Sequence, residues 1–235
     1  MSLDTFQPWL VVVVAVVMGW FAAGVIYNIR HGNAVLRWLQ EALPRIGGKT
    51  TLRWLGTSVV ELKIERAKPP FRRVHLLLVM EPRDVPWLWL PARLARRRDT
   101  LIFRSALVSA PRLEYEISAA ESWTGRQAIQ RAQNRRWSQQ PLGDHQFMAP
   151  SASQSVSFSG AENALREASL AHRQVWLLSA RREFPQLELH IPFPNPKSEK
   201  ALEFVEALRS LGRQVSSGEF GAGKPTPPAE GPPTG

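Results

Sequence analysis

The residue types best suited to chemistry lie between Val85 and Arg104, where a run of tryptophan and leucine is followed directly by arginines. Tryptophan favours the headgroup level of a membrane, and arginine binds phosphate through two parallel hydrogen bonds. A loop with this order is suited to dip its apolar tip into a cytoplasmic leaflet while its arginines hold lipid phosphates. Two alternatives are a docking patch for a partner protein and a hairpin excursion packed on the domain's own core. The candidate contact residues are Trp87, Leu88, Trp89, Leu90, Arg93, Arg96, Arg97 and Arg98.

A second group of arginines lies on a segment with helical spacing that ends near Trp137. A basic helix of this kind suits the phosphates of lipid or RNA, or it forms an ordinary solvated face. Few aromatic residues alternate with these arginines, which counts against nucleic acid. The members of this group are Arg126, Arg131, Arg135 and Arg136.

No motif predicts a catalytic or metal centre. Gly48-Lys49-Thr50 resembles the end of a phosphate-binding loop, but Leu43 stands where that motif needs a glycine. The pair Asp144-His145 lacks a third group in sequence, and Glu81-Pro82-Arg83-Asp84 fits a turn in which Arg83 makes a local ion pair. The histidines are not spaced as zinc ligands, and the absence of cysteine excludes disulfides and thiol catalysis. We therefore expect no metal and no cofactor, with a membrane-associated enzyme lacking a recognisable motif as an alternative.

The elements that must position these residues begin with an uncharged apolar run from Trp9 to Ile29. A helix needs roughly 20 mostly apolar residues to cross a bilayer. No Lys or Arg precedes the run and no small-residue cleavage site ends it, which favours an uncleaved anchor over a signal peptide. The positive residues that follow predict an outside N-terminus and a cytoplasmic domain at a bacterial-type plasma membrane. These residues are Arg30, Arg37, Arg45 and Lys49.

Small residues recur every four positions within this apolar run. Ala15, Gly19 and Ala23 fall on one helical face, where small side chains let two membrane helices approach closely. This stripe predicts a homodimer through the anchor, unless it reflects only the abundance of Gly and Ala in such helices.

The charge of the chain also bears on its partners. Thirty Lys and Arg face 20 Asp and Glu, giving a formal net charge of +10. A basic domain held beside an anionic leaflet is attracted to it by about 1 kcal/mol per well-placed Lys or Arg. Anionic lipid headgroups and nucleic acid are therefore the expected anionic partners, and a solvated basic surface is the alternative.

Residues 33–43 have the spacing of an amphipathic helix, with Asn33 as its N-cap and Pro44 at its end. This helix is suited either to lie in the membrane interface or to cover the core of the domain.

The following region is rich in strands. Residues 60–64 alternate apolar and charged side chains, and 74–80 is a nearly continuous apolar run typical of a doubly covered central strand. Residues 101–108 and 113–117 are expected to pair as a hairpin, and 175–178 with 187–191 as another.

Helices are expected where capping signals precede apolar periodicity. Two segments have the capping-box form, one opening at Ser118 and one at Ser159, and the last helix is expected over 199–211. Residues 138–158 are expected to form a loop, and 118–137 with 199–211 could end two ββα units.

The sum is an antiparallel, hairpin-rich α+β fold of six strands after a single transmembrane helix. The expected organisation is an anchor (1–30), a juxtamembrane helix and linker (31–47), a basic cytoplasmic domain (48–215) and a disordered Pro- and Gly-rich tail (216–235). The expected function is a non-enzymatic scaffold or recruitment module on the inner leaflet, with a protein partner. A membrane-tethered nucleic-acid-binding protein is the first alternative.

Overall fold

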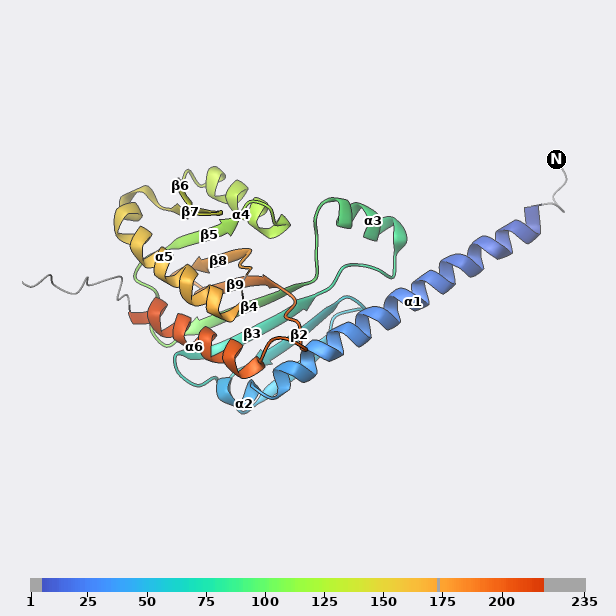
Figure 1. The fold of residues 1–235 in the computed structure, drawn as a ribbon, viewed down its shortest axis with the longest axis horizontal. Coiled ribbons are helices and arrows are strands. Elements are labelled where there is room, and N and C mark those ends of the chain that lie inside the picture. Colours follow the sequence, from blue (N-terminus) through green and yellow to red (C-terminus); the bar gives the residue numbers. More distant parts are fainter. Residues whose placement is uncertain (1–5, 173, 218–235) are drawn as a thin grey trace, which may run out of the picture.

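The computed structural model describes residues 6–217, residue 173 excepted, and has an α+β fold. Its centre is a nine-stranded sheet in the order β1-β2-β3-β4-β9-β8-β5-β7-β6, in which every pair of neighbours is antiparallel (Figure 1). The strands are β1 Thr50–Trp54, β2 Val59–Ile64, β3 Phe71–Val79, β4 Thr100–Leu107, β5 Tyr115–Ala119, β6 Ser138–Leu142, β7 His145–Ala149, β8 Leu177–Ala180 and β9 Leu187–Pro192.

Six α-helices accompany the sheet in the described residues, and Figure 1 shows α5 and α6 side by side across one of its faces. The helices are α1 Phe6–Gln40, α2 Leu43–Ile46, α3 Pro86–Leu94, α4 Trp123–Asn134, α5 Gln154–Ala171 and α6 Ala201–Ser217, and a short 3₁₀ turn covers Ser151–Ser153.

The long N-terminal helix α1 joins two environments without a break. Its outer half carries exposed apolar side chains, whereas Val35, Trp38 and Leu39 near its end are buried in the domain. The indole Nε1 of Trp38 donates to the carbonyl of Glu199, which fixes α1 to the start of α6. Residues 33–40 therefore continue α1 instead of beginning a helix at Asn33, and their apolar face covers the core.

The main core lies between one face of the sheet and the helices that cover it, which are α5, α6, α2 and the end of α1. Strand β2 presents alternate residues to this core, because Val60, Leu62 and Ile64 are buried while the intervening side chains are half-buried. The same alternation holds in β3, so the expectation of a doubly covered strand at 74–80 is wrong. Only one face of β3 lies under the helices.

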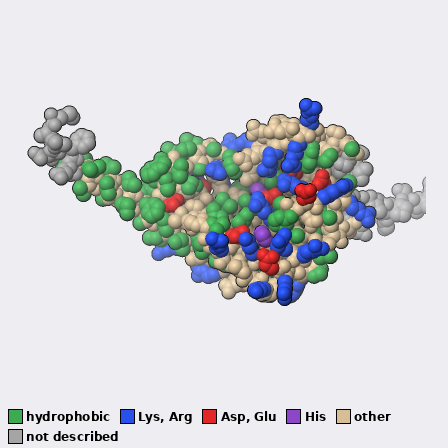
Figure 2. Space-filling view, turned by 180° about the vertical axis from the view of Figure 1, so that it is seen from behind, with side chains coloured by type: hydrophobic (Ala, Val, Ile, Leu, Met, Phe, Trp, Pro, Cys, Tyr) green, Lys and Arg blue, Asp and Glu red, His purple; other side chains and the backbone are tan. Residues whose placement is uncertain are grey.

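Helix α4 covers the other face at the far end of the sheet. Successive strand residues point to opposite faces, and in β8 Leu178 belongs to the main core while Leu177 packs with Ala128 and Ala132 of α4. The opposite face over β2, β3 and β4 is left without a helix of its own, and Figure 2 shows charged side chains gathered there.

Several pairings differ from those expected. The 101–108 strand pairs with β3 and β9, and the 115–119 strand with β7 and β8, so the predicted hairpin between them is wrong. Residues 138–149 form the β6–β7 hairpin instead of a loop, and β1 is a further strand that the sequence did not predict. These three additions raise the strand count from six to nine. The β8–β9 hairpin is confirmed.

Helix starts also differ from the capping-box signals. Ser118 lies in β5, and α4 begins after Ser122, whose Oγ accepts from the Gly125 amide at 2.9 Å. Glycine is required at 125 because a Cβ there would lie 1.9 Å from the Ala119 carbonyl oxygen. Ser159 lies inside α5, which starts five residues earlier, at Gln154.

The end of the chain bears on the expected tail. Residues 216 and 217 belong to α6. The remainder, 218–235, lies outside the described residues, so the tail stays a prediction.

Candidate membrane interface

The segment expected as a loop at 85–98 contains helix α3, which lies against the outer half of α1. The rings of Trp89 and Trp20 meet with centroids 6.0 Å apart, and Trp20 Nε1 donates to the Arg83 carbonyl at 2.9 Å. Pro86 stands in the first turn of α3, where a missing N–H costs nothing. The excursion between β3 and β4 is thus packed on the apolar helix and not on the sheet (Figure 1).

A glycine permits this close approach. A Cβ at Gly24 would lie 2.5 Å from the backbone of Arg83 and Asp84, which is closer than side-chain atoms come in proteins. One turn further along α1, the buried Asn28 donates from Nδ2 to the Glu81 carbonyl at 3.0 Å and accepts from Arg83 at 3.2 Å. An amide in an apolar helix is therefore satisfied by the base of the α3 excursion.

Ion pairs fix the base of the excursion to the domain. Arg83 makes a two-bond pair with Asp99 at 2.8 and 2.9 Å, and His31 lies 3.4 Å from the same carboxylate. Burial raises the pKa of Asp99, but hydrogen bonds from His31, Arg83 and the Glu81 amide outweigh it and lower that pKa to about 2. The carboxylate is therefore charged at neutral pH and holds α1, β4 and the excursion together.

Buried Glu81 plays the same part for α3 itself. Its carboxylate accepts from Trp89 Nε1 at 2.8 Å and from Arg93 Nη1 at 3.1 Å. The predicted contact set is thereby divided, because Trp89 and Arg93 face the protein's own groups. Trp87, Leu88 and Leu90 face outward.

The outward face of α3 is a large exposed apolar surface. Trp87 is 64% exposed, Leu88 54%, Leu90 55% and Leu94 76%. Figure 2 shows the green surface of α1 continuing onto the adjoining part of the domain. Side chains of this size are seldom gathered in the open on a monomeric protein unless another apolar phase covers them.

The predicted basic helix is confirmed only in part, because α4 carries Arg126 and Arg131 but ends at Asn134, before Arg135 and Arg136. The molecule itself uses part of this positive charge. Arg126 donates to the Ala95 carbonyl at 2.8 Å, at the end of α3, and Arg135 lies over the ring of Trp137. Arg131 and Arg136 are exposed. The structure therefore brings Arg126 to the 93–98 arginines, a neighbourhood that their sequence separation hides.

The small-residue stripe is exposed along its whole length. Ala15, Gly19 and Ala23 have no covering group, and a Cβ at Gly19 would meet nothing within 4 Å. This face is open surface in the described residues, and dimerisation through it stays a prediction.

A cluster that the sequence did not predict crosses the open face of the sheet. Arg104, Glu188, Ser179 and Glu116 are successive cross-strand neighbours on β4, β9, β8 and β5. Arg104 Nε donates to Glu188 at 2.8 Å, and Arg181 pairs with Glu116 at 2.6 Å. The residues are 65 to 84 positions apart in these pairs, so no local pattern announces them.

Glu188 is the central member of this row. Burial raises the pKa of Glu188, but hydrogen bonds from His190 at 2.9 Å and from Arg104 outweigh it and lower that pKa to about 2. Within the described part of the chain, Ser118 Oγ, Ser179 Oγ and His190 Nδ1 are buried without a hydrogen-bond partner.

The other sequence candidates are scattered. His145 Nε2 contacts the Val175 carbonyl at 2.9 Å, a structural bond between β7 and the segment just before β8. The Glu81 carboxylate accepts a hydrogen bond from Trp89, and the Asp84 carboxylate accepts one from Thr57. Across residues 6–217, apart from 173, no three His, Asp or Glu side chains gather as metal ligands.

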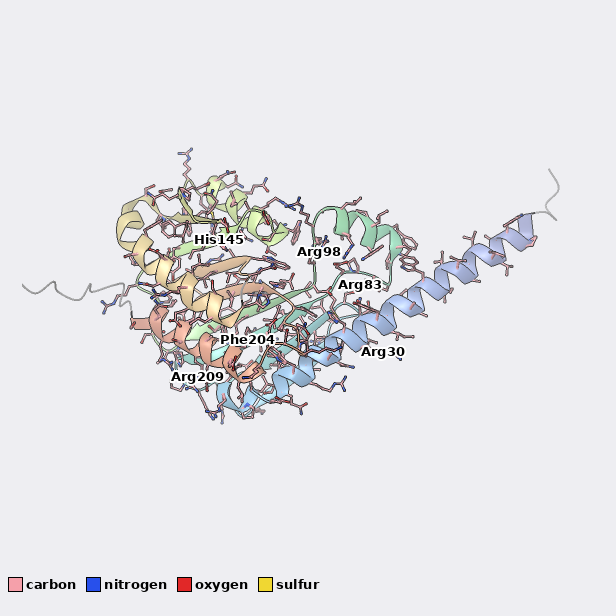
Figure 3. The ribbon with its side chains drawn as sticks, in the orientation of Figure 1. Arg30, Arg83, Arg98, His145, Phe204 and Arg209 are labelled. Atoms are coloured by element: carbon pink, nitrogen blue, oxygen red, sulfur yellow. The ribbon has the colours of Figure 1, made fainter. Side chains whose placement is uncertain are left out.

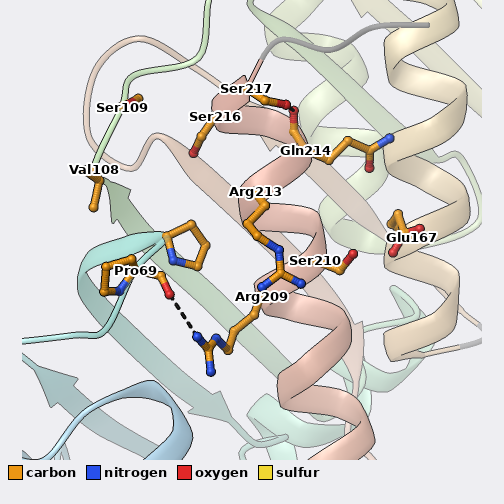
Figure 4. A pocket seen from close by; sticks show the side chains of 11 residues that line it. Pro69, Val108, Ser109, Glu167, Arg209, Ser210, Arg213, Gln214, Ser216 and Ser217 are labelled. Carbon is orange, nitrogen blue, oxygen red and sulfur yellow. Dashed lines mark hydrogen bonds between the residues drawn. The ribbon is translucent and has the colours of Figure 1, made fainter.

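A wide depression lies at the end of the domain away from α1, between α6 and the loops at 69–70 and 108–109 (Figure 4). Arg209 donates to the Pro69 carbonyl across it at 3.1 Å. We assign this depression no ligand.

Comparison with protein-family models and with curated proteins finds no match to this chain. Helix α1 is the one helix of the described residues whose length and composition would let it cross a membrane, a test that buried core helices and signal sequences also pass. Unlike a core helix, α1 has almost none of its apolar window buried in the molecule.

Proposed function

We propose that this chain is a single-pass membrane protein whose domain rests on the cytoplasmic leaflet and scaffolds or recruits another protein there. The observation that carries the proposal is the packing of Trp89 on Trp20, which places α3 beside the apolar half of α1 with four large apolar side chains exposed. If the hydrocarbon core of a membrane surrounds the outer half of α1, it would also cover the exposed apolar face of α3.

The geometry of the helix supports a position within the leaflet. Trp20 precedes Arg30 by ten residues, or about 15 Å along a helix, which is about half the hydrocarbon thickness of a bilayer. With Arg30 at the inner headgroups, α3 would lie in the inner leaflet. Each large apolar side chain buried there contributes up to about 1.5–3 kcal/mol. The positive residues after the anchor favour the cytoplasmic side for the domain.

Depth-dependent quenching tests the position of α3. Because the chain has no cysteine, a single fluorophore can be placed by Leu88→Cys, with Leu202→Cys on α6 as the matched exposed control. In nanodiscs containing lipids brominated along the acyl chain, we expect quenching at 88 and none at 202. Equal quenching at both positions would refute insertion of α3.

Recruitment of a partner is supported by the uncovered sheet face. The ring of Phe184 is 44% exposed and packs against Arg73 and His75 on β3, an aromatic and arginine combination common at binding hot spots. Co-purification of the full chain from native membranes, compared between Phe184→Ala and the control Val108→Ala, tests this. A partner retained equally by both variants would exclude this face as its docking surface.

A further inference from the structure

A pocket of about 260 Å³ lies behind α3, between the link from α3 to β4 and the first turn of α4. Its floor and walls are apolar, with Ile102 on β4 and the indoles of Trp123 and Trp176. Arg96, Arg97 and Arg98 also line it. Apolar walls with a few convergent polar groups are typical of ligand sites.

The arginines of this pocket differ from their neighbours in charge compensation. Arg83 and Arg93 are each paired with a carboxylate, whereas within residues 6–217 no carboxylate pairs with Arg96, Arg97 or Arg98. The guanidinium of Arg97 lies 3.9 Å from the ring centroid of Trp123. Arg98 donates to the carbonyls of Arg93 and Arg97, which rigidifies the link.

The one carboxylate at the pocket does not offset this charge. Glu81 is a lining residue, but its two oxygens already accept from Trp89 and Arg93 and lie near Arg83. The first turn of α4 adds the positive end of a 12-residue helix, with Thr124 lining the pocket. The pocket therefore has an excess of positive charge beside apolar walls, which suits an anion attached to an apolar group.

The position of the pocket beside α1 indicates that such a ligand would come from the membrane. Figure 3 shows Arg83 and Arg98 on the side of the domain from which α1 leaves, and Arg83 donates to Asn28 of that helix. The bond from Arg126 to the Ala95 carbonyl keeps α4 against the end of α3. We propose that this pocket binds the phosphate group of an anionic phospholipid of the inner leaflet, with Arg96 and Arg97 as the phosphate-binding residues. The inference rests on the proposed membrane position and adds a lipid class to it.

The test uses the full chain in detergent and measures lipid binding by native mass spectrometry. Phosphatidylglycerol is titrated against phosphatidylcholine, with glycerol 3-phosphate and inorganic phosphate as water-soluble arms. The pocket variant is Arg96→Gln/Arg97→Gln, and the charge-matched control is Arg66→Gln/Arg72→Gln, with one exposed arginine in the turn before β3 and one in the first residues of β3. Arg96→Lys/Arg97→Lys keeps the charge but loses two-bond geometry, and it guards against a folding defect in the Gln variant.

We expect one phosphatidylglycerol per chain, at least tenfold weaker binding in the Gln variant, a smaller loss in the Lys variant and none in the control. Equal losses in the Gln variant and the control would overturn the site, because they would show general charge attraction. Binding of the water-soluble phosphates as tightly as the lipid would support phosphate recognition and overturn the lipid source. If the Gln variant binds phosphatidylglycerol as tightly as the unchanged chain while the fluorophore at position 88 is still quenched, this inference is refuted and the proposed membrane position remains intact.

Discussion

Substitution of a single glycine should separate α3 from α1. In Gly24→Ala the new Cβ would lie 2.5 Å from the Arg83 carbonyl, where ordinary contacts are 3.4 Å or more, so the two backbones must part by about 1 Å. That movement breaks the bonds from Trp20 to Arg83 and from Asn28 to Glu81, now 2.9 and 3.0 Å long.

The free energies decide the sign of the effect. Each lost hydrogen bond costs about 1 kcal/mol, and leaving the buried Asn28 amide unsatisfied raises the loss to about 2–4 kcal/mol. Alanine recovers about 1 kcal/mol through its higher helix propensity. We therefore expect the contact between α3 and α1 to weaken by about 1–3 kcal/mol.

Gly19→Ala is the matched control, because a Cβ at Gly19 meets nothing within 4 Å. It should gain the helix propensity and lose nothing. Hydrogen–deuterium exchange of residues 81–94 in nanodiscs is the assay. Because the helix-propensity gain is common to both variants, the loss of about 2–4 kcal/mol remains between them, and exchange in Gly24→Ala should be roughly 30- to 900-fold faster than in the control. The docking of α3 on α1 is wrong if the two variants exchange alike.

Three further perturbations test the domain. Ser122→Ala removes the cap that accepts from the Gly125 amide and should lower the free energy of unfolding by about 1 kcal/mol in chemical denaturation. Glu188 should contribute full stability above pH 4.5 and lose it as the pH falls toward 2, and Glu188→Gln should flatten that part of the stability profile. Trp38→Phe loses the bond to the carbonyl just before α6 and should lower the thermal midpoint more than Trp87→Phe, whose indole makes no bond to described residues. An unchanged midpoint, profile or unfolding energy would count against the respective contact.

Local patterns predicted local features well. The alternation at 60–64 identified both the strand and its buried face, and the apolar run at Trp9–Ile29 identified the outer part of α1. These predictions are confirmed because an element with one buried face has apolar residues at the repeat of a strand or a helix, and that repeat is visible in the sequence. Strand 138–142 has no such period, since it lies at the edge of the sheet with exposed Gln and Pro side chains.

The candidate site was predicted in composition but not in geometry. Its Trp and Arg residues were identified, and the expected local ion pair is present because Arg83 lies 3.6 Å from Glu81. The shorter bonds of Arg83, to Asp99 and Asn28, had no signal in the sequence. Arg83 and Asn28 are 55 positions apart, and only folding brings them together. The glycine at 24 carries no sequence signal of its own, because glycine is common in apolar helices.

The unbroken course of α1 from its exposed half into the core has a mechanical consequence. Because α1 is unbroken between Ile29 and Val35, a tilt of its outer half would rotate the whole domain as one rigid body. One extra residue inserted there would rotate the domain by about 100° about the helix axis. The orientation of the domain relative to a surface is thus written into the phase of one helix.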